Sequence, residues 1–304
     1  MRSSQFSLRR DDGIELAVHA WLPERPRAAL QIAHGAAEHA MRYARAAERL
    51  ARAGYAVYAN DHRGHGATAR SGAELGALAE CGGFERAVAD LAALNAELRA
   101  RHPGLPVALL GHSLGSFLVQ QYLCEHGATL DAAVLSGSTR LAALPELPAP
   151  APGAPAIDPF ALLNAPFEPS RTPFDWLSRD PEEVDRYCSD PRCGFALSAA
   201  TLAELARLPE RLYAPERLAR IPRELPLYLF AGDRDPVNQA LAGLEALVEC
   251  YRAAGLRRLE LRAYPGGRHE MLNETNRDEV MDDLAQWLER ALFGAQAPPG
   301  AEAR

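Results

Sequence analysis

One serine lies between two glycines in a pattern that suits nucleophilic chemistry. Gly111-His112-Ser113-Leu114-Gly115 follows a short apolar run at residues 107–110 and precedes a helical pattern of apolar residues. This context predicts a strand, a sharp turn and a helix, because the run is too short to form a helix of its own. In such a turn the glycines remove side chains that would collide, so the serine Oγ is exposed at the carboxyl end of the strand. Ser113 is therefore the predicted nucleophile.

A serine nucleophile needs a base that accepts its proton and a carboxylate that orients the base. His269 is the only histidine after His126, and it lies in a loop after the last predicted strand, where such a base belongs. The loop after the preceding predicted strand carries Asp233 and Asp235, and either carboxylate could accept the imidazole N–H. The other would then pair with Arg234 or cap the following helix. The residues alone leave the acid open between these two aspartates.

The oxyanion formed in acyl transfer needs two backbone N–H donors. Leu114, the residue after the nucleophile, supplies one of them. The other donor comes from the loop after an earlier strand, and His34-Gly35-Ala36 follows the predicted strand at residues 28–33. Ala36 is the expected second donor.

Residues near these two loops are the candidates for contact with a substrate, and they are His34, Gly35, Glu38, Arg42 and His112. For Glu38 and Arg42 there are two interpretations, contact with a polar head group or an i,i+4 ion pair on the first helix. Four histidines and one aspartate near these loops could also be interpreted as the metal site of a metallohydrolase, and they are His34, His39, Asp61, His62 and His65. The spacing of residues 61–66 is not typical of zinc ligands, and the two glycines in this segment suit a tight turn. These five residues are therefore expected to organise the loops.

Composition excludes several classes of function. The 304 residues are 48% hydrophobic, enough for one large α/β domain with an insertion. A net charge of −7 offers no footprint for nucleic acid or an anionic membrane. The chain contains no lysine, which excludes Schiff-base chemistry and a P-loop lysine. The chain has five cysteines and no Cys-x-x-Cys pair, which predicts no disulfide framework. It has no apolar run typical of a signal peptide or a membrane span, so a soluble cytoplasmic protein is expected.

Strands and helices alternate along most of the chain, which predicts a mostly parallel sheet covered by helices on both faces. A turn signal at residues 11–13 closes an expected hairpin between residues 6–9 and 14–22. The remaining predicted strands lie at residues 28–33, 55–59, 106–110, 131–136, 226–231 and 257–264. The predicted helices lie near residues 42–53, 84–101, 114–126, 239–254 and 276–293.

The alternation stops between residues 138 and 223. This segment opens with a proline- and alanine-rich stretch at residues 144–159 and continues with short helical patterns that carry many aromatic residues. An insertion after a strand, at the edge where active-site loops gather, predicts a lid over the nucleophile. The expected division is an α/β core at 1–137 and 224–294, a lid at 138–223 and a disordered tail at 295–304.

Five motifs, taken in their order along the chain, resemble those of a known family. They are residues 34–39 with Arg42 and Tyr43, residues 61–66, residues 111–115, residues 232–235 and residues 264–269. They resemble the monoacylglycerol lipase and lysophospholipase group of α/β-hydrolases, also called the serine aminopeptidase S33 type. The resemblance implies an α/β-hydrolase fold with a helical lid inserted after the sixth strand. It implies Asp235, rather than Asp233, as the acid beside His269 and Ser113, and it also implies Ala36 and Leu114 as the oxyanion donors.

The expected function is hydrolysis of a monoacyl lipid ester, such as a lysophospholipid or a monoacylglycerol, through an acyl-enzyme and without a metal or organic cofactor. The expected partner is this small acyl-ester substrate, with no nucleic acid, no stable membrane insertion and at most transient membrane contact through the lid. Alternatives are a hydrolase of a small ester, lactone, peptide or carbon–carbon bond, and a non-catalytic receptor for a small ligand. Acyl chain length, head group and oligomeric state stay open.

Overall fold

The computed structural model describes residues 1–141 and 159–294. The predicted tail at 295–304, and the proline-rich stretch at 144–159 apart from its last residue, lie outside the described residues.

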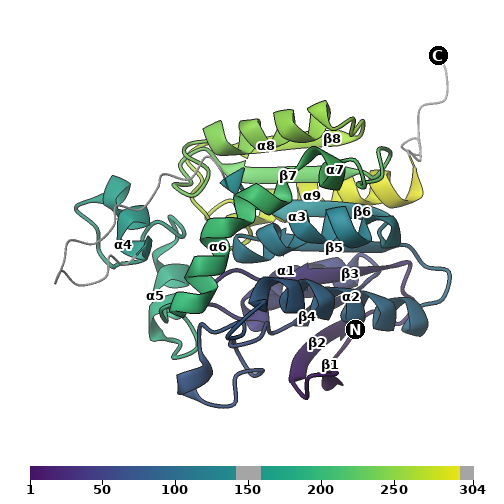
Figure 1. Cartoon of the computed structure of the whole chain (residues 1–304), viewed down its shortest axis with the longest axis horizontal. Helices are drawn as coiled ribbons and strands as arrows, with labels where there is room; N and C mark the ends of the chain where they lie inside the picture. The colour runs from purple at the N-terminus through teal and green to yellow at the C-terminus, as the bar shows by residue number, and fades with distance from the viewer. Residues whose placement is uncertain (142–158, 295–304) are drawn as a thin grey trace.

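An eight-stranded sheet in the order β1-β2-β4-β3-β5-β6-β7-β8 forms the centre of the described structure (Figure 1). The first two strands form an antiparallel hairpin and β2 runs antiparallel to β4, whereas all other neighbours are parallel. The strands are β1 (Arg2–Arg9), β2 (Glu15–Leu22), β3 (Ala28–Ala33), β4 (Tyr55–Asn60), β5 (Val107–His112), β6 (Ala132–Ser136), β7 (Leu227–Gly232) and β8 (Leu259–Tyr264). The mostly parallel sheet predicted from the alternation of elements is confirmed.

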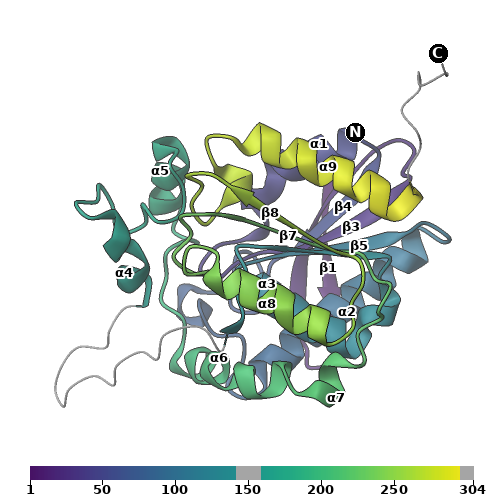
Figure 2. The ribbon, with the colours of Figure 1, turned by 90° about the horizontal axis from the view of Figure 1, so that it is seen from above.

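Helices cover both faces of the sheet, because its central strands are apolar on both sides. Every residue of β3, β4, β5, β6 and β7 is buried. Figure 2 shows α1 and α9 on one face and α2, α3 and α8 on the other. These helices are α1 (Ala44–Arg52), α2 (Gly83–Arg101), α3 (Leu114–His126), α8 (Ala242–Ala253) and α9 (Arg277–Phe293). The short 3₁₀ helices of the core are η1 (Ala40–Tyr43), η2 (Gly72–Glu74), η3 (Gly127–Thr129) and η6 (Met271–Asn273).

Two helix starts differ from the sequence-based prediction. The helix expected near 42–53 is divided into η1 and α1. The helix expected near 239–254 begins only at Ala242, because Gln239, Ala240 and Leu241 have φ angles of 55°, 52° and 80°. A right-handed α-helix cannot include three such residues. The start predicted for this helix was therefore wrong by about one turn.

The described part of the segment between β6 and β7, where the sequence predicts an insertion, contains short helices. Its described elements are α4 (Pro159–Asn164), η5 (Ala165–Phe167), α5 (Pro181–Ser189), α6 (Ala199–Leu212) and α7 (Pro215–Leu218). Figures 1 and 2 both place α4 and α5 beyond one end of the sheet. Within the described ranges, none of the helices combines the length and the apolar character needed to cross a bilayer.

Candidate active site

Ser113 is the single residue between β5 and α3, and few residues other than glycine adopt its backbone conformation. Its φ is 49° and its ψ is −120°, so the chain turns sharply from strand to helix. The flanking glycines are required by space, because a Cβ at Gly111 would lie 2.5 Å from the Gly115 carbonyl oxygen. A Cβ at Gly115 would lie 2.1 Å from the carbonyl oxygen of Ala33. The two glycines thus permit the close packing that the strained serine needs.

His269 and Asp235 form a buried hydrogen-bonded pair at the ends of neighbouring strands. Both carboxylate oxygens of Asp235 lie 3.0 Å from His269 Nδ1. The Asp235 carboxylate is fixed in turn by the backbone N–H of Val237 at 2.9 Å. The structure brings Asp235 to the imidazole, whereas Asp233 Oδ1 instead accepts a 2.7 Å hydrogen bond from the N–H of Gly266.

Ser113 and the imidazole of His269 share one small cavity. His269 Nε2 is buried and has no hydrogen-bond partner among the described residues. Ser113 and His269 line one small cavity of about 20 Å³, together with Gly35 and Ala36 of the loop after β3. The arrangement offers an imidazole nitrogen that can accept a proton in the same small cavity as a half-buried serine.

The charge of Asp235 governs the protonation of His269. Burial lowers the pKa of the imidazole, but the negative charge and the hydrogen bond of Asp235 act in the opposite direction, and Glu270 and Glu38 reinforce them. The pKa of His269 is therefore raised above its ordinary value. His112, whose ring centroid lies 4.6 Å from that of His269, has its pKa held well below its ordinary value, chiefly by burial, and stays neutral.

The loop that carries Ala36 packs directly against Ser113. A Cβ on Gly35 would lie 2.7 Å from Glu38 Oε1 and 3.2 Å from the Ser113 Cβ, so any larger residue would force these neighbours to shift. Among the hydrogen bonds of the described residues, none is donated by the backbone N–H of Ala36 or Leu114. The N–H of Leu114 has no acceptor within its helix because Leu114 is the first residue of α3. Both groups meet the chemical requirement for the predicted oxyanion donors.

The histidines near this loop hold backbone segments together. His34 Nε2 accepts a 2.9 Å hydrogen bond from the N–H of His62, and its Nδ1 lies 2.8 Å from the carbonyl of Gly35. His62 Nε2 lies 3.0 Å from the carbonyl of His34. Burial holds the pKa of His34 well below its ordinary value and lowers that of His65 to about 4. These ring nitrogens serve backbone contacts, which fits loop organisation better than metal binding.

Asp61 has a similar role in the same region. Its carboxylate accepts hydrogen bonds from the N–H groups of Ala40 at 2.8 Å and Ala67 at 2.7 Å. It thereby joins the start of η1 to the turn after β4.

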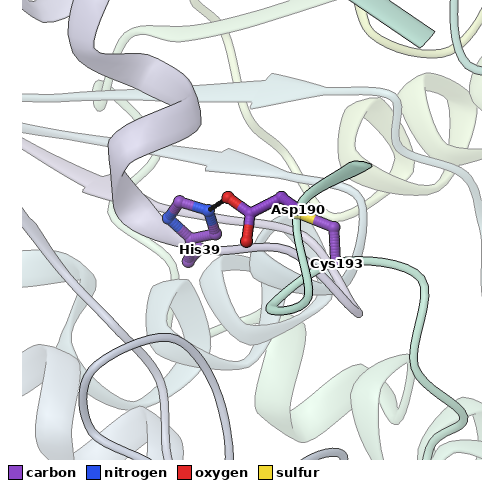
Figure 3. Close-up of side chains that lie close together, drawn as sticks. All are labelled: His39, Asp190 and Cys193. Atoms are coloured by element: carbon purple, nitrogen blue, oxygen red, sulfur yellow. Dashed lines mark hydrogen bonds and ion pairs between the residues drawn. The ribbon is translucent and has the colours of Figure 1, made fainter. Parts of the chain in front are cut away.

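His39 connects the core to the insertion. Its Nε2 lies 2.9 Å from Asp190 Oδ2, and Cys193 stands beside this pair (Figure 3). The potential ligand atoms of the three residues lie within 4.8 Å of one another. However, Arg192 also bonds to the Asp190 carboxylate, at 3.3 Å, and burial raises the pKa of the Cys193 thiol far above its ordinary value. The cluster is therefore better explained as a contact between the insertion and the core than as a cation site.

Glu38 and Arg42, the pair with two interpretations from sequence, are joined by the i,i+4 ion pair at 3.1 Å. Arg42 also bonds to Glu270, and the hydroxyl of Tyr43 donates to Glu38 at 2.7 Å. Burial, reinforced by the charge of Glu270, raises the pKa of Glu38 to about 7. Arg42 is thus occupied by two buried carboxylates, which leaves it poorly placed for a head group.

A large apolar cavity of about 820 Å³ opens beside Ser113. Core residues Leu114 and Phe117 contribute to one side, and leucines of the insertion contribute to another. Leu162 of α4 and Leu202 of α6 line this cavity and are also exposed to solvent, by 46% and 36%. An elongated hydrophobic ligand fits such a space. The remaining apolar residues of the insertion that line it are Leu163, Pro166, Phe167, Trp176, Leu197 and Leu205.

Sequence reasoning missed the residues of the insertion that contact the catalytic loops. The hydroxyl of Tyr187 and the N–H of Gly194 both bond to the carbonyl of Ala37. The N–H of Glu270 donates to the carbonyl of Leu177 at 2.8 Å, next to the loop of His269. No spacing or residue type in the insertion marks these positions, because each contact joins segments about 90 to 160 residues apart.

Comparison with known proteins identifies a family that matches most of the chain. The family model described as "Serine aminopeptidase, S33" matches residues 24–276. The chain is 33% identical over 291 residues to the monoacylglycerol lipase of Mycolicibacterium smegmatis, an alignment that covers 94% of this chain and 96% of that protein. It is 29% identical over 296 residues to the monoglyceride lipase of Mus musculus, covering 95% of this chain and 92% of that protein.

A similar fold is found among solved structures. A thermostable carboxyl esterase from Bacillus coagulans, in complex with glycerol, superimposes with a TM-score of 0.84 at 27% identity. The match covers 96% of this chain and all of that chain (100%).

Proposed function

The chain belongs to the serine aminopeptidase S33 family of serine hydrolases, and we propose that it hydrolyses the ester bond of monoacyl lipids through a triad of Ser113, His269 and Asp235. The observation that carries this proposal is the 820 Å³ apolar cavity that opens at Ser113 beside the His269–Asp235 pair. Monoacylglycerol lipases among the relatives support the same class of substrate.

In the proposed first step, Ser113 Oγ attacks the ester carbonyl carbon while His269 Nε2 accepts the hydroxyl proton. Asp235 keeps the imidazole N–H on Nδ1 and stabilises the imidazolium that forms. The N–H groups of Ala36 and Leu114 stabilise the negative oxygen of the tetrahedral intermediate. This intermediate collapses as His269 gives its proton to the leaving alcohol, which leaves an acyl group on Ser113.

In the second step, a water molecule takes the place of the alcohol. His269 accepts a proton from this water, which attacks the acyl carbonyl, and the same N–H groups stabilise the second oxyanion. Return of the proton to Ser113 Oγ releases the fatty acid and restores the enzyme. Ser113 and His269 are the only residues that this scheme needs to move protons.

The insertion at 138–223 is proposed to act as a lid over the acyl cavity. Its leucines supply much of the apolar lining, and Leu162 and Leu202 expose apolar surface at the same cavity. Exposed apolar side chains at a cavity opening favour brief contact with a lipid surface, from which a monoacyl substrate can enter.

The test is fatty-acid release from lysophosphatidylcholine, monoacylglycerol and short-chain aryl esters by the wild type and Ser113→Ala in parallel. We expect long-chain lipids to be cleaved, and Ser113→Ala to lose at least about 10⁴-fold in turnover while its circular dichroism stays unchanged. Cleavage of only the short esters would contradict the lipid substrate. Undiminished activity in Ser113→Ala would contradict the triad.

A matched control is available next to the nucleophile. Ser116 is buried, and its hydroxyl bonds to the Ser113 carbonyl at 2.6 Å and to the Ser138 hydroxyl at 2.8 Å. Ser116→Ala removes one hydroxyl three residues from the proposed nucleophile. We expect it to retain most of the activity, because its hydroxyl takes no part in the proposed proton transfers.

A further inference from the structure

Three arginines line the apolar cavity, which is unusual for a site that holds only an acyl chain. They are Arg179, Arg234 and Arg268. A Cβ on Gly266 would lie 2.8 Å from Arg179 Nη1, and the N–H of Arg234 donates to the Gly267 carbonyl at 2.9 Å. All three therefore gather around the loop that leads to His269.

Arg268 lacks a carboxylate within ion-pair distance among the described residues. Its Nη1 donates to the backbone carbonyls of Asp175 and Ser178, and its guanidinium lies 4.3 Å from the ring centre of Phe167. Its Nε and Nη2 donate no hydrogen bond within the described part of the chain. Part of the guanidinium fork is thus available to a ligand in the cavity.

The two other arginines differ in their availability. Arg179 is already paired with the buried carboxylate of Glu274 at 2.9 Å and bonds to Asn276. Arg234 is 73% exposed at its side chain, and the nearest carboxylate oxygen is on Asp233 at 4.0 Å. Arg234 and Arg268 are therefore the cations that a substrate could engage without breaking a close ion pair.

The small cavity restricts where the alcohol part of a substrate can lie. Its volume of about 20 Å³ is close to that of one water molecule, so it has no room for a head group. Of these two cavities at Ser113, the large one is the one with room for the alcohol part beside the acyl chain. The lining of this cavity includes Arg234 and Arg268 together with apolar side chains such as Phe167.

We propose that Arg268 and Arg234 form an anion-binding subsite for the head group, and that the preferred substrate is a monoacyl lipid whose alcohol carries a phosphate. This inference rests on the proposed ester hydrolysis and narrows its substrate to lysophospholipids. A guanidinium binds phosphate oxygens through charge-assisted hydrogen bonds, and two arginines from adjoining loops suit a group with several oxygens. The glycerol head group of a monoacylglycerol gives these cations no such partner.

The experiment compares kcat/KM for two substrates with the same octanoyl chain, 1-octanoyl-glycerol and 1-octanoyl-glycerol-3-phosphate. Both are used below the concentration at which they form micelles, so that surface charge plays no part. We expect the wild type to prefer the phosphate-bearing ester. In Arg268→Gln the ratio of the two kcat/KM values should fall about tenfold, and in Arg234→Gln it should fall several-fold.

Two further variants separate charge from structure. Arg268→Lys keeps the positive charge and should retain a larger share of the preference than Arg268→Gln. Arg290→Gln removes an exposed arginine that pairs with Glu260 on the edge strand β8 and does not line the cavity, and it should leave the ratio unchanged. Because the readout is a ratio, a general loss of activity through the neighbouring His269 does not alter it.

Two outcomes would overturn the inference. One is a wild-type enzyme that cleaves the neutral ester as well as, or better than, the phosphate-bearing one. The other is a preference that both Arg268→Gln and Arg234→Gln retain. In either case, the proposed ester hydrolysis would stand as long as the wild type cleaves the neutral ester and Ser113→Ala does not. A wild type that cleaves neither ester would refute the proposed ester hydrolysis itself.

Discussion

The hydroxyl of Tyr187 donates a 2.8 Å hydrogen bond to the backbone carbonyl of Ala37, which ties helix α5 of the insertion to the loop that carries the proposed oxyanion donor Ala36. The N–H of Gly194 donates to the same carbonyl at 2.9 Å. Ala37 is fully buried and has a φ of 53°, a conformation that an alanine adopts only when its surroundings impose it. Part of the insertion therefore supports the loop of the proposed oxyanion donor, and other residues of the insertion line the cavity.

Tyr187→Phe should lower kcat about tenfold while KM changes little. The variant keeps the aromatic ring, which stacks with Arg42 at 4.9 Å, and loses only the hydrogen bond to Ala37. A loosened peptide after Ala36 would misalign a donor that acts in the transition state, and small misalignments of such groups are costly. Steady-state kinetics on a soluble ester would measure the effect.

The control for this variant is Tyr213→Phe. The hydroxyl of Tyr213 also makes buried hydrogen bonds, but to Gln120 at 2.7 Å and to the N–H of Leu141 at 3.0 Å. Tyr213→Phe should lower the free energy of unfolding without lowering kcat. Equal kcat values for wild type and Tyr187→Phe would show that the oxyanion loop does not depend on this contact.

Asp235→Asn should reduce kcat/KM about 10³–10⁴-fold, and Asp233→Asn should change it less than about threefold. An amide at position 235 can donate to His269 Nδ1 and so favours the tautomer that cannot accept the serine proton. Asp233 instead bonds to the N–H of Gly266, a contact that the asparagine side-chain oxygen can keep. The reverse ranking, measured on one ester, would move the acid by two residues.

Much of the fold was predictable because its signals are local. The apolar runs at β5 and β7 are continuous over four or more residues and that at β3 is interrupted only by Gln31, since strands buried on both faces leave no room for alternation. The helix from 114 to 126 was predicted with its observed limits, because it begins at the glycine-flanked turn and ends at Gly127. The start of α8 was mispredicted, since nothing in Gln239, Ala240 and Leu241 signals three successive positive φ angles.

Some residues of the candidate site were predictable because their signals are local in the sequence, and others were not. Ser113 and His269 follow predicted strands, and the carboxyl ends of parallel strands meet at one edge of a sheet. The residues alone could not separate Asp233 from Asp235, because both lie in one loop, and the family resemblance was needed to favour Asp235. The contact of Tyr187 with Ala37 spans 150 residues of sequence separation and leaves no local pattern.

The acid limb of the pH profile should have its midpoint above 6.5, the ordinary value for histidine. His269 must be neutral to accept the serine proton, and a raised pKa means that the protonated form persists to higher pH. kcat/KM therefore rises with pH through this pKa. Asp235, Glu270 and Glu38 are the acidic groups that raise it, and neutral His112 adds no charge.

Glu270→Gln tests the electrostatic contribution to this pKa, because it removes one negative charge and should move the midpoint to lower pH. Glu279→Gln is the control, since this glutamate on α9 is 54% exposed at its side chain and pairs only loosely with Arg262 at 3.6 Å. Profiles measured with a soluble ester at constant ionic strength give both midpoints. A shift to higher pH in Glu270→Gln would mean that the charge of Glu270 does not raise the pKa of His269.

Arg42→Gln should reduce the free energy of unfolding by about 3–5 kcal/mol, as expected when one partner of a buried ion pair is removed. Arg42 lies between Glu38 and Glu270, and the side chains of all three are at most 8% exposed. Its loss would leave two buried carboxylates facing each other. Urea unfolding would measure the change against Arg52→Gln, which breaks an exposed i,i+4 pair with Glu48 and should cost at most about 0.5 kcal/mol.

The pH dependence of this loss gives a second, independent readout. Without Arg42, the pKa of Glu38, already raised to about 7 by burial and the charge of Glu270, would rise further. A carboxyl group with a pKa raised by folding binds a proton more tightly in the folded state than in the unfolded state. The folded variant therefore gains stability relative to the wild type as pH falls, and its deficit should be smaller at pH 6 than at pH 8. A deficit that grows on acidification would show that Arg42 does not act by neutralising these two carboxylates.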